Sequence, residues 1–125
     1  MESELRWAND RILSLPVNDS MWRLALEEGC DRSHWFCDRT AEGSHQDKIG
    51  RLERCLVRGH GGDPLLDRQK EFVKLLEARG VHVDARFHEG GFHGVELFDP
   101  SKLQILEDDI KDFIDASTEG SSLLQ

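Results

Sequence analysis

Two side chains in the second half of the sequence have the chemistry of a proton relay. Asp63 follows one short apolar run, and His93 follows another, 30 positions later. A histidine that acts as a general base needs a carboxylate on its other ring nitrogen, which fixes the tautomer and stabilises the imidazolium. Glycines at positions 90, 91 and 94 allow the tight backbone turns that would present the ring. The two residues are therefore candidates for the acid and the base of a catalytic triad.

The same pattern also fits a plainer interpretation. Many small proteins carry an aspartate and a histidine on separate loops, and most glycine-rich loops are only turns. The two residues can act together only if the elements that carry them bring both loops to one edge of the fold.

Both loops follow segments with the pattern of β-strands. Cys55-Leu56-Val57 is a short apolar run that leads into a glycine turn, which is typical of a buried strand. From position 81 to 87, apolar and polar residues alternate. This alternation predicts a second strand with one face in water, as expected near the edge of a sheet.

Segments with helical spacing separate and follow these strands. Asp67 is expected to cap a helix that ends at Gly80. The apolar face of this helix consists of Phe72, Leu75 and Leu76. A last helix is expected to begin at Asp99-Pro100, because proline is favoured at the first helical position. Its apolar stripe consists of Leu103, Leu106, Ile110, Phe113 and Ile114.

The order strand, helix, strand, helix with short connections predicts an α/β fold with parallel strands. In such sheets, functional groups lie beyond the carboxyl ends of the strands. The loops 59–67 and 88–99 both lie at that edge. This architecture would bring Asp63 and His93 together.

Residues 1–54 are irregular and charge-rich, and they include all three tryptophans. A short helix is expected over Ser20–Glu28, closed by Gly29. The stretch from 30 to 51 is expected to be a loop, and residues 117–125 a polar tail.

The composition argues against several classes of partner. The 16 basic and 25 acidic residues give a net charge of −9, and no basic stripe is present to neutralise nucleic-acid phosphates. No apolar run approaches the roughly 20 residues that span a bilayer, and the acidic first residues do not fit a secretory signal. Three cysteines cannot all pair within one chain, and they fit free thiols in a reducing compartment. We expect a cytoplasmic protein without nucleic-acid or membrane partners.

The segments around the two candidate residues resemble the plant carboxylesterase family. That family belongs to the hormone-sensitive-lipase-like α/β-hydrolases, which include the gibberellin receptor. The similarity is densest in two runs, Gly62-Asp63-Pro64-Leu65-Leu66-Asp67-Arg68-Gln69 and Glu89-Gly90-Gly91-Phe92-His93-Gly94-Val95-Glu96-Leu97. Weaker similarity extends the match to about 5–114, through Ser20-Met21-Trp22 and Cys30-Asp31-Arg32.

The resemblance implies a fold and a set of roles. Residues 1–54 would form a cap-like segment, 55–116 the C-terminal βαβα portion of an α/β-hydrolase, and 117–125 its tail. Asp63 would be the triad acid, His93 the triad base and Trp22 a wall of the substrate pocket, although a plain core tryptophan is an equal alternative. The implied substrate is a small-molecule ester, and the implied chemistry needs no metal or cofactor.

The other half of a serine esterase site is missing from the sequence. No serine stands in a Gly-x-Ser-x-Gly motif, and the nearest candidates, Ser44 and Ser122, lack the pair of flanking glycines that the strained elbow requires. His60-Gly61-Gly62 imitates an oxyanion loop but directly precedes the acid, so we interpret it as the turn after a strand. We therefore expect a truncated gene product, a partial gene model or a splice fragment that hydrolyses nothing by itself.

Two other functions fit parts of the sequence. Cys30, His34, Cys37 and His45 have donor types that suit zinc, although no Cys-x-x-Cys spacing is present. A non-catalytic ligand-binding or regulatory protein is the second alternative, since the gibberellin receptor keeps the hydrolase fold while dispensing with the catalytic histidine. The retention of His93 with its glycines favours descent from a working esterase.

Overall fold

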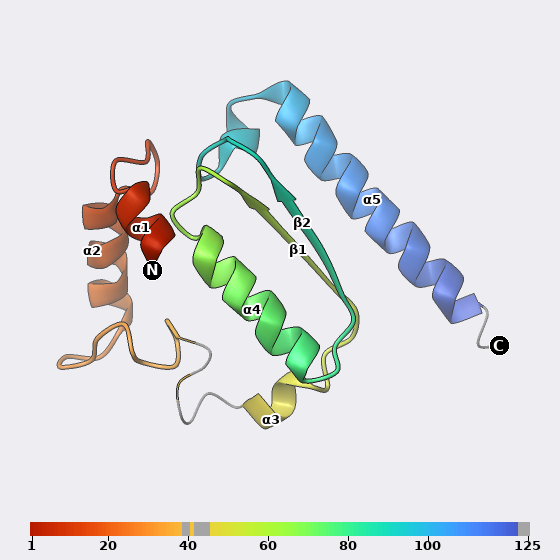
Figure 1. Ribbon diagram of the computed structural model, residues 1–125, viewed down its shortest axis with the longest axis horizontal. Helices are drawn as coiled ribbons and strands as arrows, with labels where there is room; N and C mark the ends of the chain where they lie inside the picture. Colours follow the sequence, from red (N-terminus) through yellow and green to blue (C-terminus); the bar gives the residue numbers. More distant parts are fainter. Residues whose placement is uncertain (39–40, 42–45, 123–125) are drawn as a thin grey trace.

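Two parallel strands lie side by side in the middle of the molecule, with one long helix against each face (Figure 1). The computed structural model describes residues 1–38, 41 and 46–122. Strand β1 (Cys55–His60) pairs with β2 (Val83–His88) in register from Cys55 opposite Val83 to His60 opposite His88. Helix α4 (Leu66–Ala78) connects the strands, and α5 (Pro100–Ser122) follows them. The predicted α/β fold with parallel strands is confirmed.

The second strand does not have the wet face that its alternation predicts. The polar side chains of β2 lie on the face that α5 covers, where Arg86 donates to Asp109 of that helix at 2.7 Å. Arg58 of β1 reaches the same carboxylate at 2.6 Å. The prediction was wrong because the charges are neutralised by a partner from a distant helix, and alternation alone does not reveal such a partner.

Helix α4 begins without the side-chain cap that the sequence predicts. Its N-cap residue is Leu65, whose side chain cannot cap it, and the hydroxyl of Ser3 instead accepts the N–H of Asp67 in the first turn at 3.1 Å. Asp67 lies inside the first turn and accepts the backbone N–H of Ser3 at 2.7 Å, so its carboxylate serves a tertiary contact in place of a cap. The helix ends as expected, with Gly80 at φ +81° directly after it.

Helix α5 begins at Pro100 as predicted, and the Asp99 carboxylate accepts the N–H of Ser101 at 2.9 Å. The helix continues to Ser122, beyond the end expected at 116, and residues 123–125 lie outside the described part. Several members of its predicted apolar stripe are exposed, with Leu103 and Ile110 at 42% and Ile114 at 55%. That side of α5 is therefore not buried by any described element.

The first half contains more helix than the sequence predicts. Helix α1 (Glu2–Arg6) leads by a loop to α2 (Leu15–Ala25), and a short α3 (Gln46–Ile49) lies within the predicted 30–51 loop. The helix expected over Ser20–Glu28 thus begins and ends earlier. Pro16 near its first position explains the early start, because proline has the dihedral of a helix N-terminus.

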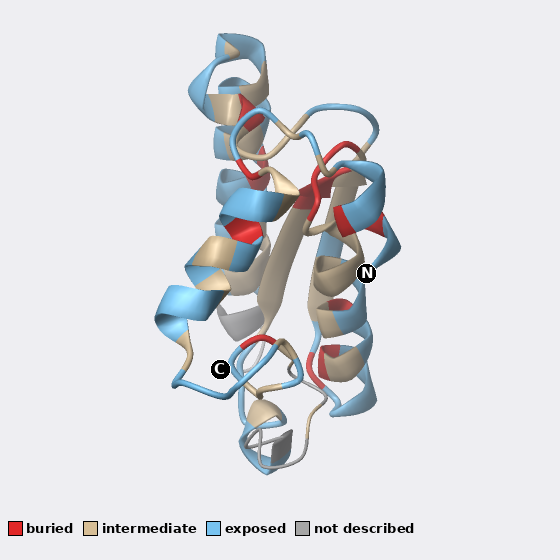
Figure 2. Ribbon diagram, turned by 90° about the vertical axis from the view of Figure 1, so that its left-hand side faces the viewer, coloured by how far each residue is buried: buried red, intermediate tan, exposed pale blue. Residues whose placement is uncertain are grey.

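The buried core is small. The apolar side chains that are buried in the described part are Leu13, Cys37, Pro64, Val73, Leu76, Val81 and Val95, and Figure 2 shows how few buried positions the chain has. None of the helices in that part is both long enough and apolar enough to cross a membrane. The core therefore depends on few residues, of which Leu76 on α4 has no exposed surface.

Leu76 gives a direct test of this core. We expect Leu76→Ala to lower the free energy of unfolding by about 2–5 kcal/mol, because the truncation leaves a cavity beneath the sheet. Urea unfolding followed by circular dichroism measures the change. Leu24→Ala is the matched control, since Leu24 is 86% exposed. Equal losses in the two variants would contradict this account of the core.

Candidate active site

The two residues predicted to act together do meet at the carboxyl ends of the strands. Asp63 follows β1 and His93 follows β2, and Oδ2 of Asp63 lies 3.0 Å from Nδ1 of His93. The carboxylate is nearly buried, with 7% of its side chain exposed, whereas the imidazole keeps 34% exposed. The other carboxylate oxygen accepts the N–H of Leu65 at 2.8 Å, which fixes the carboxylate plane.

This contact selects one tautomer of the neutral His93 ring. With Nδ1–H donating to Asp63, the neutral imidazole has its lone pair on Nε2. Within the described part of the chain, Nε2 of His93 has no hydrogen-bond partner. His93 is one of the residues that line a hollow of about 170 Å³; the others are Arg58, Gly59, His60, Asp63, Gln69, Gly94 and Glu96. The ring is thus arranged to accept a proton from a group outside.

Close contact between two backbones brings the acid to the histidine. The N–H of Gly61 donates to the carbonyl of His88 at 2.8 Å, and that of Gly62 donates to Gly90 at 3.0 Å, so the two turns continue the pairing of the strands. A β-carbon at Gly62 would overlap the carbonyl oxygen of Gly91. The predicted tight turns are confirmed, because Gly91 has φ +74°.

Helix α1 clamps the turn that carries the acid. Oγ of Ser3 donates to the carbonyl of Pro64 at 2.7 Å, and its N–H donates to Asp67. Glu4, 3% exposed, accepts Nε of Arg68 at 2.8 Å. The Asp-Pro-Leu-x-Asp-Arg run therefore has a structural explanation: its first residue contacts His93, and Pro64, Asp67 and Arg68 fasten the turn to α1.

Ionic contacts beneath the site fasten the segment after His93, and the sequence analysis missed them. Oε1 of Glu96 lies 2.6 Å from Nε2 of His60 and 3.2 Å from Nη1 of Arg58. Glu96 belongs to the short helix η1 (Val95–Leu97), so these contacts join it to β1. The signal was the polar residues of β1 at alternate positions, which place Arg58 and His60 on one face.

These contacts lower the pKa values of two carboxyl groups, those of Glu96 and Asp109. Burial alone would raise the pKa of Glu96, but the hydrogen bond from His60 and the contacts with Arg58 outweigh it and lower that pKa. Burial likewise opposes ionisation of Asp109, yet hydrogen bonds from Arg86 and Arg58 lower its pKa. Both groups are therefore stabilised as carboxylates.

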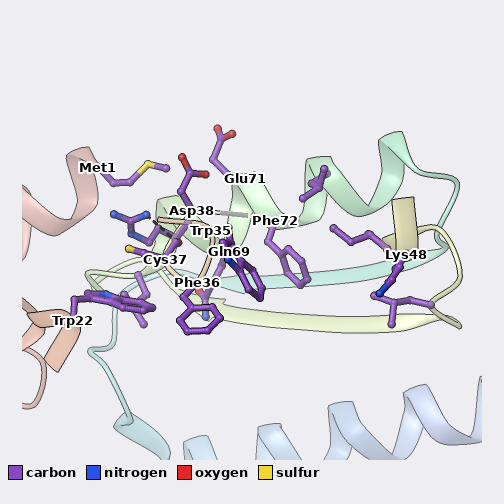
Figure 3. Close-up of a pocket in the computed structure, with 15 residues that line it drawn as sticks. Met1, Trp22, Trp35, Phe36, Cys37, Asp38, Lys48, Gln69, Glu71 and Phe72 are labelled. Carbon is purple, nitrogen blue, oxygen red and sulfur yellow. Dashed lines mark hydrogen bonds between the residues drawn. The ribbon is translucent and has the colours of Figure 1, made fainter. Parts of the chain in front are cut away.

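Trp22 lies in a second, larger hollow. This hollow is about 660 Å³ in volume and lies between α4 and the segment after α2, with Trp35 and Phe36 beside Trp22 (Figure 3). Trp22 does not line the smaller hollow at His93, but Gln69 lines both. Trp22 is thus a pocket wall in this structure, and its contact with a substrate stays a prediction.

The residues considered for zinc do not form a described cluster. His45 lies outside the described residues, and within the described ranges no three His, Cys, Asp or Glu side chains gather as a metal site would require. The ring of His34 packs edge-on against Phe36 at 4.8 Å. Burial raises the pKa of the Cys37 thiol, which disfavours the thiolate that zinc needs.

Comparison with known proteins identifies the fold family of the chain. A family profile described as the α/β-hydrolase fold matches residues 1–97, more than three quarters of the chain. The chain belongs to the α/β-hydrolase fold family. The fold class predicted from the sequence is therefore confirmed for an α/β-hydrolase.

Plant carboxylesterases are among the relatives of this α/β-hydrolase. Probable carboxylesterase 9 of Arabidopsis thaliana is 48% identical over 113 residues, which cover 90% of this chain and 35% of the relative. The 3-O-acetylpapaveroxine carboxylesterase CXE2 of Papaver somniferum is 45% identical over 116 residues, 90% of this chain and 37% of its own length. The resemblance to plant carboxylesterases is confirmed, and the chain spans about a third of the length of the relatives it matches.

The ionic contacts of this α/β-hydrolase predict a dependence of stability on pH. The pKa values of Glu96 and Asp109 are lowered in the folded state, as is that of Glu4, where the contacts with Arg68 outweigh burial. Their stabilisation is therefore complete above about pH 4 to 5 and is lost as the pH falls through the lowered values. Urea unfolding at pH 6 and pH 3 measures the loss.

A pair of variants tests whether Glu4 contributes to this dependence of stability on pH. Glu4→Gln removes one of these carboxylates and should weaken the pH dependence. Glu27→Gln, at an exposed position, should leave it as it is. An equal free energy of unfolding at the two pH values in the unmodified chain would refute the ionic account.

Proposed function

We propose that this chain supplies the acid and the base of a serine-type carboxylic ester hydrolase. The observation that carries the proposal is the contact between the buried Asp63 carboxylate and Nδ1 of His93, whose ring stays 34% exposed at the strand ends. The membership in the α/β-hydrolase family and the carboxylesterase relatives support it, because the acid precedes the histidine in hydrolases of this fold.

The arrangement accounts for two proton transfers. Nε2 of His93 takes the proton from a serine hydroxyl while the oxygen forms a bond to the ester carbonyl carbon. Asp63 stabilises the resulting imidazolium and keeps the ring in position. The imidazolium then returns the proton to the leaving alcohol as the carbon–oxygen bond of the ester breaks. Water then attacks the acyl-serine carbon while Nε2 of His93 takes its proton. Return of that proton to the serine oxygen releases the carboxylic acid product.

The serine must come from outside this sequence. The chain has no Gly-x-Ser-x-Gly motif, and no serine is among the described residues that line the hollow at His93. The chain by itself therefore has a relay without a nucleophile, and its substrates belong to the larger hydrolase. We propose small carboxylic esters as that class, with Trp22 as a pocket wall.

The chain by itself tests the first part of the proposal. We expect no hydrolysis of p-nitrophenyl acetate above a buffer control, because no activated serine is present. Release of p-nitrophenolate and labelling by a fluorophosphonate are the two measurements. Turnover that the fluorophosphonate abolishes would show that the chain contains its own nucleophile.

A chimera tests the second part. The region of the Papaver carboxylesterase CXE2 that this chain matches is replaced by the corresponding residues of this chain. We expect the chimera to hydrolyse p-nitrophenyl acetate, His93→Ala to lower kcat by at least about 10³-fold, and Asp63→Asn to lower it by a smaller factor of at least about 10².

His82→Ala is the matched control for the chimera, since His82 is an exposed histidine just before β2, away from the strand ends that carry the site. Its kcat should equal that of the unmodified chimera. Near-normal kcat in the His93→Ala variant would reject the assigned role. A chimera that unfolds cooperatively but has no turnover would favour a ligand-binding role for this fold.

A further inference from the structure

A turn far away in the sequence holds the backbone of His93. The loop between α1 and α2 contains Asp10, whose Oδ2 accepts the backbone N–H of His93 at 3.1 Å. The two residues are 83 positions apart. His93 therefore contacts two carboxylates, one at its ring through Asp63 and one at its main chain through Asp10.

The Asp10 carboxylate is itself fixed. Its Oδ1 accepts the N–H groups of Ile12 at 2.9 Å and Leu13 at 2.8 Å, and Leu13 is buried. Burial alone would raise the pKa of Asp10, but the hydrogen bonds from Leu13, His93 and Ile12 outweigh it and lower that pKa. The backbone N–H of His93 therefore donates to a carboxylate whose position is fixed by the other hydrogen bonds of the turn.

A second contact joins the same two segments. The guanidinium of Arg11 lies over the ring of Phe92, 5.4 Å from its centroid. Asp10 therefore contacts His93, and the adjacent Arg11 contacts the adjacent Phe92. Two adjacent contacts hold both the position and the direction of the loop.

The histidine loop needs such support because of its own sequence. Glycines at 90, 91 and 94 all have positive φ values, and the loop 89–94 has no regular secondary structure. The pairing of the strands continues only as far as the bond from Gly62 to the carbonyl of Gly90. Beyond that bond, the N–H of Val95 donates to the carbonyl of Phe92 at 3.1 Å, and the N–H of His93 itself is held by Asp10.

We infer that Asp10 is a positioning residue that sets the main chain of His93 so that Nε2 faces a substrate. This role rests on the proposed function, since it concerns the base of the ester hydrolase. Asp10 touches no reacting atom. It acts through the N–H of His93 alone, and Arg11 reinforces it through Phe92.

One substitution separates this role from the stability of the turn. Asp10→Asn can keep Oδ1 for the N–H groups of Ile12 and Leu13, but it then presents an amide N–H group to His93, which cannot accept a hydrogen bond. Asp31→Asn is the matched control. Oδ1 of Asp31 accepts the N–H of Ser33 at 2.8 Å in an exposed turn.

Amide hydrogen exchange in the 125-residue chain tests the inference without any catalysis. We expect the His93 amide to exchange about tenfold faster in Asp10→Asn, because a charge-assisted hydrogen bond is lost, and unchanged in Asp31→Asn. In the unmodified chain, a scalar coupling across the hydrogen bond should join the His93 nitrogen to the Asp10 carboxyl carbon. Unaltered exchange in Asp10→Asn, or no coupling, would overturn the inference.

The CXE2 chimera tests the consequence for catalysis. We expect Asp10→Asn to lower kcat about ten- to hundredfold with little change in KM, as for a misplaced catalytic group. A general loss of folding would lower the amount of active enzyme and the unfolding midpoint together. An active chimera with unchanged kcat would overturn the positioning role. An inactive chimera with faster His93 exchange would refute the proposed function and leave the positioning contact established.

Discussion

The Asp63 carboxylate can reach the imidazole of His93 only because two turns meet backbone to backbone. Gly62 and Gly91 stand at that meeting point, where a single added carbon would overlap a carbonyl oxygen. The approach lets the hydrogen bonds of the sheet continue two residues past each strand, to Gly62 and Gly90. The acid is then buried against a half-exposed base, which stabilises one tautomer without closing access to the other nitrogen.

The rest of the fold holds these two turns from three sides. Helix α1 binds the acid turn through Ser3 and Glu4, and η1 is joined to β1 through Glu96. In the α1–α2 loop, Asp10 accepts the backbone N–H of His93. All three attachments use charged or polar groups paired over long sequence distances. A small domain with few buried apolar side chains thus obtains a defined site from hydrogen bonds that are individually modest.

The sequence predicted the parts of this structure that depend on local pattern. A short apolar run located the first strand, period-two alternation located the second, and the glycines located the turns that present Asp63 and His93. It failed where a partner from elsewhere decides the outcome: the polar face of β2 is covered because Asp109 lies on α5, and Asp67 leaves its capping role because Ser3 is near. Asp10 was missed for the same reason, since a turn-forming aspartate does not reveal a partner 83 residues away.

The outer edges of the two strands have a consequence for the life of the chain in a cell. In the described part, the sheet has only these two strands, so each leaves one row of backbone groups unpaired. Helix α5, which runs alongside the sheet in Figure 1, carries further exposed apolar residues, among them Leu103, Ile110 and Ile114. Chaperones and proteases act on unpaired strand edges and exposed apolar side chains. The abundance of the polypeptide in a cell would therefore be higher if another protein segment covered them.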